Sequence, residues 1–188
     1  MSELILQPRR TAVVVIDLQK GIVAFPTAHP IAEIVARASA LAEAFRRQSL
    51  PVVLVNVDGV APGRTEQPIR LRELPAGWTD LVPELNRQPQ DHLVTKRTWG
   101  AFTNTDLEAH LKSLGVTQVV ITGVATSAGV ESTARHANEL GFNVVLAVDA
   151  MTDMNVDAHH NSLTRIFPRL GETGTAQEIL DLLGKRSA

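Results

Sequence analysis

Two side chains of opposite charge follow apolar runs of the sequence and could move protons for a reaction. Asp17 ends the run Ala12–Ile16, and Lys96 follows the run His92–Thr95. The residues just past parallel strands gather at one edge of a sheet, where ligands bind. An ammonium beside a carboxylate keeps it ionised and positions it for proton transfer. Each residue alone is as well explained by a turn or a solvated surface charge, but together they are candidates for an acid–base pair.

A third segment, Ile121–Arg135, reads as a strand, a turn of small residues and the start of a helix. Backbone N–H groups at such a helix start can bind an oxyanion or a carboxylate. A tight strand–helix turn also needs small residues simply to pack. The candidate substrate- or oxyanion-binding residues of this turn are Val124, Ala125, Thr126, Ser127 and Gly129.

Three further residues are candidates for contacts with a substrate. Phe25, Trp99 and Phe102 could form an apolar wall over Asp17, although Phe102 is better explained as a core residue before its helix. Gln19 lies just past the strand that Asp17 ends. Arginines in the long segment Asp58–Gln90 could clamp a carboxylate, although solvated arginines are the commoner case. These arginines are Arg64, Arg70 and Arg72.

The elements that must position these residues are short β-branched apolar runs alternating with helical patterns. The expected strands are Ala12–Asp17, Pro51–Val57, His92–Thr95, Gln118–Gly123 and Asn143–Asp149, with a weaker sixth near Gly171–Thr173. The expected helices are Ile31–Gln48, Thr105–Leu114, Ser127–Leu140, Asp157–Ile166 and Ala176–Leu183. Nearly continuous apolar strands are typical of parallel sheets covered on both faces. We therefore expect one α/β domain over residues 1–188, a three-layer doubly wound, mainly parallel sheet of about six strands with helices on both faces.

The composition of the chain excludes several classes of partner and of chemistry. The 188 residues are 44% hydrophobic with a net charge of -2 and no basic stripe, so we expect neither a nucleic-acid nor a membrane partner. No apolar run approaches the length of a membrane span, and we expect a cytoplasmic protein. The chain has no cysteine, which excludes disulfides, thiolate metal sites and thiol catalysis.

No metal and no cofactor are expected. Asp106 and His110 are spaced to share a helix face, but two ligands seldom make a metal site. The sequence has neither the glycine pattern of a dinucleotide site after its first strand nor a Walker-type loop. The irregular segment Asp58–Gln90 is long enough to be a functional lid or an oligomer contact.

Three stretches together resemble the isochorismatase-like hydrolase superfamily, in order and spacing, over most of residues 11–180. They are VVVIDLQ at 13–19, TKRTWGAFTNTDLEAHLKSLGV at 95–116 and ITGVATSAGVESTARHANELGFNVVLAVDA at 121–150. The resemblance implies that Asp17 is the catalytic acid or base, that Lys96 is its cationic partner, and that the Val124–Ala125 peptide is cis. It also implies a small-molecule substrate and a homo-oligomer, a dimer or larger.

The chain departs from most of that superfamily at Gly129, which stands where the amidases, including nicotinamidases, have a cysteine nucleophile. An acyl-thioester route is therefore closed. Glycine also occurs there in true isochorismatases, which cleave a vinyl ether without a covalent intermediate. Those enzymes have a tyrosine and a histidine where this chain has Ala125 and Ser127, and the chain contains no tyrosine. A serine nucleophile at Ser127 is disfavoured, because a side chain two residues away points elsewhere on a helical turn.

The leading hypothesis is a metal-free hydrolase that uses Asp17 and Lys96 for acid–base chemistry, with a vinyl ether or related carboxylate as the candidate substrate. One alternative is a non-catalytic binding or assembly protein that kept the fold. Another is an amidase that uses directly activated water, which is harder because an amide lacks the easy carbon protonation of an enol ether.

Overall fold

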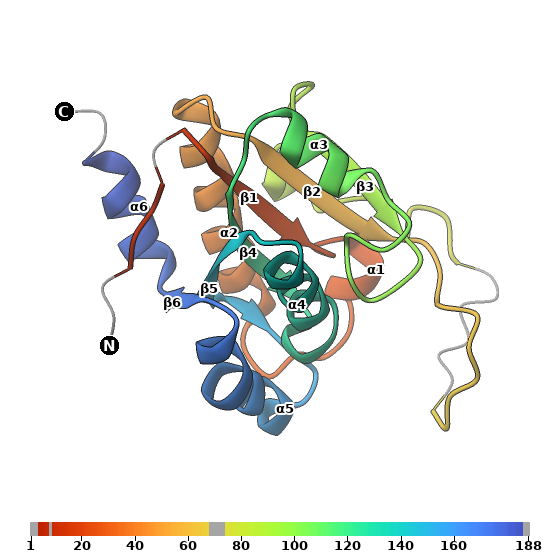
Figure 1. Ribbon diagram of the computed structural model, residues 1–188. Helices are drawn as coiled ribbons and strands as arrows, with labels where there is room; N and C mark the ends of the chain where they lie inside the picture. Colours follow the sequence, from red (N-terminus) through yellow and green to blue (C-terminus); the bar gives the residue numbers. More distant parts are fainter. Residues whose placement is uncertain (1–3, 8, 68–73, 186–188) are drawn as a thin grey trace.

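The computed structural model describes residues 4–7, 9–67 and 74–185. Its centre is a six-stranded parallel sheet of order β3-β2-β1-β4-β5-β6. The strands are β1 (Thr11–Ile16), β2 (Val52–Val57), β3 (His92–Lys96), β4 (Gln118–Val124), β5 (Asn143–Thr152) and β6 (Glu172–Gly174). The chain builds outward from β1 in one direction and then in the other (Figure 1), so the predicted doubly wound α/β fold is confirmed.

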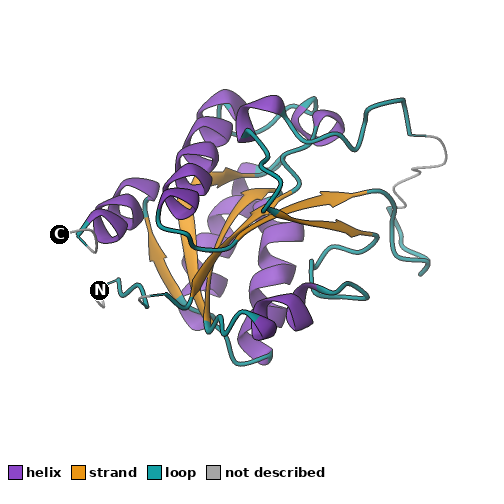
Figure 2. Ribbon diagram, turned by 90° about the horizontal axis from the view of Figure 1, so that it is seen from above, coloured by secondary structure: helices purple, strands orange, loops and turns teal. Residues whose placement is uncertain are grey.

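Helices cover both faces of the sheet (Figure 2). α2 (Ile31–Arg47) and α6 (Ala176–Gly184) pack against one face, and α3 (Leu107–Ser113) and α4 (Glu131–Glu139) pack against the other. Alternate residues of β1 belong to the two cores: Val13 and Val15 face the α2 side, and Val14 and Ile16 face the α4 side. This two-sided burial is why the strand is a continuous apolar run.

The irregular elements are where the structure departs from the expected boundaries. The expected helix Ser127–Leu140 begins as a π-helical turn, η2 (Thr126–Val130), before α4. The expected helix Asp157–Ile166 is divided into α5 (Val156–Asn161) and a second π-turn, η3 (Ser162–Ile166). Such turns replace the regular hydrogen-bond pattern of an α-helix and often occur at functional sites.

Three short elements were not expected from the sequence. They are the single turn α1 (Lys20–Val23), η1 (Pro83–Leu85) and η4 (Phe167–Arg169). α1 follows β1 directly and is too short to have an apolar periodicity of its own. Within the long segment 58–90, Leu81 forms an isolated bridge with Gln19, which ties this segment to the end of β1. Two of the candidate clamp residues, Arg70 and Arg72, lie outside the described residues.

No helix among the described residues has both the length and the apolar character needed to span a membrane.

Candidate active site

Asp17 follows β1 with a backbone conformation that turns its carboxylate out of the strand direction. Its φ of 52° lies in the left-handed region, which few residues other than glycine adopt. Its N–H donates to the carbonyl of Val55 at 2.9 Å, and its carbonyl accepts from the N–H of Gln19 at 2.8 Å. Unusual backbone conformations held by their surroundings concentrate at functional sites. An uncommon backbone conformation therefore places the Asp17 side chain.

Lys96, the last residue of β3, meets Asp17 across β2. The Lys96 Nζ donates to the Asp17 Oδ2 at 2.7 Å and to the carbonyl of Thr98 at 3.2 Å. Both side chains are buried, with 2% of Lys96 and 7% of Asp17 exposed. The other carboxylate oxygen, Asp17 Oδ1, is buried and has no hydrogen-bond partner among the described residues. The lysine thus fixes one oxygen and leaves the other without a partner in the part of the chain that the structure describes.

Burial raises the pKa of Asp17 to about 6, from an ordinary value of 3.8. The positive charge of Lys96 and its hydrogen bond act in the opposite direction and keep this pKa from rising further. A carboxyl group with a pKa of about 6 exchanges its proton near neutral pH. This property suits a general acid or base, whose pKa is best placed close to the working pH.

The turn after β4 lies directly beside this pair. Its Val124–Ala125 peptide bond is cis, as the sequence resemblance implies. Gly129, in η2, faces Asp17: a Cβ added to it would lie 3.2 Å from the Asp17 Oδ2 and 3.0 Å from the Cγ2 of Ile16. A longer side chain at position 129 would therefore meet the carboxylate, and glycine keeps that space open.

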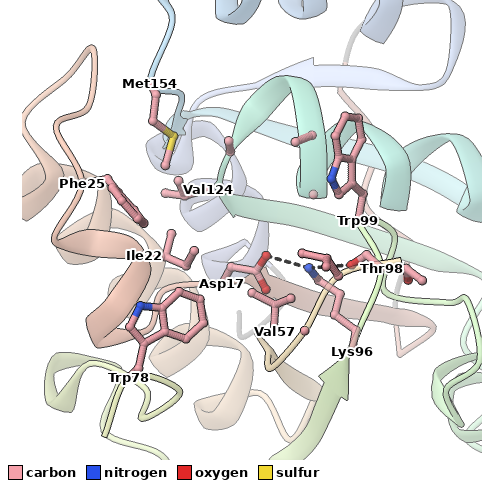
Figure 3. A pocket seen from close by; sticks show the side chains of 15 residues that line it. Asp17, Ile22, Phe25, Val57, Trp78, Lys96, Thr98, Trp99, Val124 and Met154 are labelled. Carbon is pink, nitrogen blue, oxygen red and sulfur yellow. Dashed lines mark hydrogen bonds and ion pairs between the residues drawn. The ribbon is translucent and has the colours of Figure 1, made fainter. Parts of the chain in front are cut away.

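These groups open into a cavity of about 430 Å³, a size typical of small-molecule sites. Figure 3 shows the Asp17–Lys96 pair between Ile22, Phe25 and Trp78 on one side and Trp99 on the other. The lining is mostly apolar and comprises Asp17, Ile22, Phe25, Val57, Gly59, Val60, Trp78, Lys96, Thr98, Trp99, Val124, Ala125, Ala128, Gly129 and Met154.

Trp78 forms part of this wall because α1 contains a glycine. A Cβ added to Gly21 would lie only 2.1 Å from the Trp78 indole, so the ring occupies the place of a side chain. The two segments are also joined through their backbones, since the Gly21 N–H donates to the Trp78 carbonyl at 2.9 Å. The indole is thus held against α1.

The structure places most of the candidate residues around this cavity. Of the predicted set, Asp17, Lys96, Phe25, Trp99, Val124, Ala125 and Gly129 all line it. Gln19, Thr126 and Ser127 do not line it, and their side chains bond to the protein instead. Phe102 lies in the core.

Gln19 lies outside the cavity lining and bonds to two segments that form the cavity. Its fully buried amide accepts from the Val57 N–H at 2.7 Å and donates to the carbonyls of Val57 and Trp78, at 3.0 and 3.2 Å. It therefore joins the end of β2 to the segment that carries the indole. Its amide is bonded to backbone, and Gln19 does not line the cavity.

Thr126 and Ser127 are held by residues that follow β5. The Thr126 Oγ1 is 2.8 Å from the His159 Nδ1. The Asp153 Oδ2 accepts from both the N–H and the Oγ of Ser127, at 2.7 and 2.8 Å. These two residues thus connect the turn to the β5–α5 region rather than to the cavity. The Asp153 carboxylate thus accepts an N–H group at the start of η2.

Replacing Asp153 with alanine is expected to loosen the turn at 124–130 and to lower the free energy of unfolding by about 1.5–3 kcal/mol, the usual contribution of hydrogen bonds to a charged group. The buried carboxylate bonds to Ser127 twice and to the Asn155 N–H at 3.1 Å, and all three bonds would be lost. Urea unfolding of Asp153→Ala beside Asp157→Ala, an exposed aspartate on α5, measures this. Equal stabilities of the two variants would contradict the role given to Asp153.

Sequence reasoning missed several residues of the cavity. Trp78 lies in the irregular segment after β2, and Met154 follows the unexpectedly long end of β5. A tryptophan within a long loop, opposite a short run containing glycine, was the available signal for Trp78. No feature of the sequence indicated that Met154 lies at the cavity, because β5 was expected to end at Asp149.

The described residues contain no group of three or more His, Cys, Asp or Glu side chains placed to hold a metal ion. His29 and His159 do lie together, with ring centroids 4.7 Å apart. Each bonds a threonine hydroxyl: His29 Nδ1 is 2.9 Å from Thr152 Oγ1 and His159 Nδ1 is 2.8 Å from Thr126 Oγ1. They pack behind the turn and outside the cavity lining.

Comparison with known proteins agrees with this geometry. Residues 11–178 match the Isochorismatase domain family. An uncharacterized isochorismatase family protein of Escherichia coli O157:H7, YecD, is 41% identical, with 95% of this chain and 98% of the relative covered. Another from Bacillus subtilis, YwoC, is 39% identical, with 96% and 98% covered.

The solved structures point the same way. An isochorismatase family protein from Burkholderia thailandensis superposes with a TM-score of 0.91 at 41% sequence identity, covering 95% of this chain and 97% of the other. The matched region includes β1, β3, the turn after β4 and the charge pair between them. The chain therefore belongs to the isochorismatase family and is a hydrolase of that family.

Proposed function

We propose that this protein is a metal-free small-molecule hydrolase in which Asp17 and Lys96 perform acid–base chemistry without a covalent enzyme intermediate. The observation that carries the proposal is the buried carboxylate of Asp17, which has one oxygen held by Lys96 at 2.7 Å and the other without a partner among the described residues. Its pKa of about 6 makes both protonation states available near neutral pH. Such a group can give a proton to a substrate and later recover one from water.

The chemistry proposed is hydrolysis of an activated C–O bond through addition of water to the adjoining C=C bond, with a vinyl ether or related carboxylate as substrate. The Asp17 carboxyl transfers its proton to the enol carbon, which leaves an oxocarbenium centre and the Asp17 carboxylate. Water adds to that centre and loses a proton, which returns to Asp17. The resulting hemiketal breaks its C–O bond, and an alcohol and a carbonyl compound leave. The acid is regenerated, and one water is consumed.

Gly129 occupies the place of the cysteine nucleophile in this proposal. A side chain there would approach the Asp17 Oδ2 to 3.2 Å at its Cβ alone. The glycine leaves that volume for the substrate, so that Asp17 can act on it directly. Ser127 does not replace the nucleophile, because its hydroxyl donates to Asp153 at 2.8 Å and is not part of the cavity lining.

Lys96 has a positioning and an electrostatic role. Its ammonium orients the carboxylate through a 2.7 Å hydrogen bond, and its charge restrains the rise in the pKa of Asp17 that burial causes. After proton transfer it stabilises the carboxylate that forms. A charge fixed in advance beside a developing charge lowers the barrier without reorganisation during the reaction.

A screen of vinyl ethers, esters and amides tests the proposal, with pyruvate and ammonia release as readouts. The intact protein is weighed by mass spectrometry during turnover of any substrate found. Turnover with the mass of the chain unchanged is the expected result. A substrate-derived mass adduct on the protein would contradict the non-covalent route. Thermal stabilisation by several compounds without hydrolysis of any would favour a binding protein that kept the fold.

A further inference from the structure

We infer that His29 and His159 are positioning residues, which hold three segments of the cavity wall together from outside the cavity. The segments are the loop 24–30, the turn 124–130 and residues 152–154 at the end of β5. Neither histidine lines the cavity. Their role is therefore separate from the acid–base chemistry proposed for Asp17.

Each of the three segments contributes to the wall. Phe25 belongs to the loop, Val124 to the turn and Met154 to the end of β5, and all three line the cavity. Figure 3 shows these side chains on the same side of the Asp17–Lys96 pair. Because they come from distant parts of the chain, their placement relative to one another depends on contacts between the segments.

His29 ties the loop to the end of β5. Its Nδ1 is 2.9 Å from the Thr152 Oγ1, and its backbone N–H donates to the same oxygen at 3.3 Å. A hydroxyl has one hydrogen, which Thr152 can give to the ring nitrogen while its oxygen accepts from the backbone. Beside it, the Ala28 N–H donates to the Asp153 carbonyl at 2.8 Å. Loop and strand are thus joined at two successive residues.

His159 ties α5 to the turn. Its Nδ1 is 2.8 Å from the Oγ1 of Thr126, which is fully buried. Burial lowers the pKa of His159, and His29 and His160 lower it further, against the opposite effect of Asp153. The ring is therefore neutral near neutral pH, and a neutral imidazole can accept the hydroxyl hydrogen of Thr126 at Nδ1.

The two rings meet and complete the connection. Their centroids are 4.7 Å apart, with the planes tilted by 55°. Contacts therefore run without a break from Thr152 through His29 and His159 to Thr126. A change at either histidine is expected to reach the segment that the other one holds.

Amide hydrogen exchange tests this transmission without a substrate, because it measures the local opening of each segment. His159→Leu keeps an apolar side chain in the core and removes the bond to Thr126. We expect the Ala28 N–H to exchange about three- to tenfold faster, the effect of losing one neutral hydrogen bond, although Ala28 makes no bond to His159. His160→Leu is the matched control, since His160 is the next residue of α5 and is exposed. It should leave this rate unchanged.

His29→Leu, at a less buried position, is the reciprocal test. The Val130 N–H donates to the Ala125 carbonyl at 3.1 Å within the turn, and we expect its exchange to accelerate by a similar factor. In the double variant His29→Leu/His159→Leu, the acceleration should be smaller than the product of the two single effects, because both residues belong to one connection.

Kinetics on any substrate that the screen identifies give a second readout. A displaced wall weakens binding of substrate and transition state alike, so His159→Leu should raise KM by about three- to tenfold and leave kcat unchanged. The falling limb of the pH profile, which belongs to Asp17, should stay in place.

An unchanged Ala28 exchange rate in His159→Leu would overturn the inference, as would an equal acceleration in His160→Leu. Faster exchange of every protected amide of the sheet would also overturn it, because the histidines would then stabilise the fold as a whole. The proposed function fails separately, if a substrate is hydrolysed as fast after Asp17 is replaced.

Discussion

Replacing Asp17 with asparagine is expected to lower kcat/KM by about 10²- to 10⁴-fold, the usual contribution of a positioned general acid. The change keeps the size of the side chain and removes the proton that the substrate receives. It also leaves Lys96, only 2% exposed, without its anion. Loss of one partner of a buried ion pair destabilises a protein by about 3–5 kcal/mol. The single variant therefore loses activity and stability together, and does not by itself separate the two causes.

The double variant Asp17→Asn/Lys96→Met separates them. Removing both charges of a buried pair is often neutral or stabilising by about 1–4 kcal/mol, so most of the lost stability should return while turnover stays absent. Urea unfolding and steady-state kinetics on the same preparations measure the two quantities. A stable double variant that keeps activity within about tenfold of the unaltered protein, well short of what a general acid contributes, would refute the assignment of Asp17 as the acid.

The second large effect that we expect is on the pH dependence of kcat/KM. Because the pKa of Asp17 is about 6, the protonated acid is the main form below that pH and declines above it. We expect kcat/KM to be flat at acid pH and to fall about tenfold for each pH unit above about 6, as for a single essential acid. A limb that instead rises with pH through this region would assign Asp17 as a base, and a profile without a limb there would exclude it from the chemistry.

The variant Lys96→Met is a control for this prediction, because the direction in which it shifts the pKa of Asp17 is known. The lysine charge and hydrogen bond lower the pKa of Asp17 against the effect of burial. Without them, the pKa rises and the falling limb moves to higher pH. A limb that stays in place would show that it belongs to another group. Measurement of kcat/KM for both proteins across the same buffers is sufficient.

The free energy of unfolding should also change with pH as Asp17 titrates. The folded-state pKa of Asp17 lies above its ordinary value of 3.8, so the folded protein binds this proton more tightly than the unfolded chain does. Its contribution to stability is fully present below pH 3.8 and is lost as pH rises through about 6. Denaturation at several pH values detects this, and the double variant should lack it.

The sheet and the charge pair could be predicted because both follow from rules that act over short stretches of sequence. Continuous apolar runs indicate strands covered on two sides, and the residue after each run lies at the edge where ligands bind. Asp17 and Lys96 each follow such a run. The structure places Val57 beside Lys96 and Val55 beside Ile16, which brings the two edges level. Predicting where the pair lies thus required only the order of the strands in the sheet.

The directions of side chains within the turns could not be predicted, since they depend on backbone conformations that no short pattern specifies. Ser127 and Thr126 belong to the expected turn, but the π-helical form of η2 points them at Asp153 and His159. Trp78 was missed for a similar reason: it approaches the site through a segment with no periodicity, by packing on Gly21. Each of these contacts joins residues far apart in the chain.

Asp17 and Lys96 lie 79 positions apart in the chain, and this separation has a consequence for folding. All of β2 lies between them, so the pair forms only after three strands have aligned. Bringing distant segments together costs chain entropy before their contacts can compensate, and parallel sheets are slow to form for this reason. Two charges leaving water add a cost of their own until they meet. Activity regained on dilution from denaturant should therefore follow completion of the β3-β2-β1 pairing rather than the earlier formation of helices.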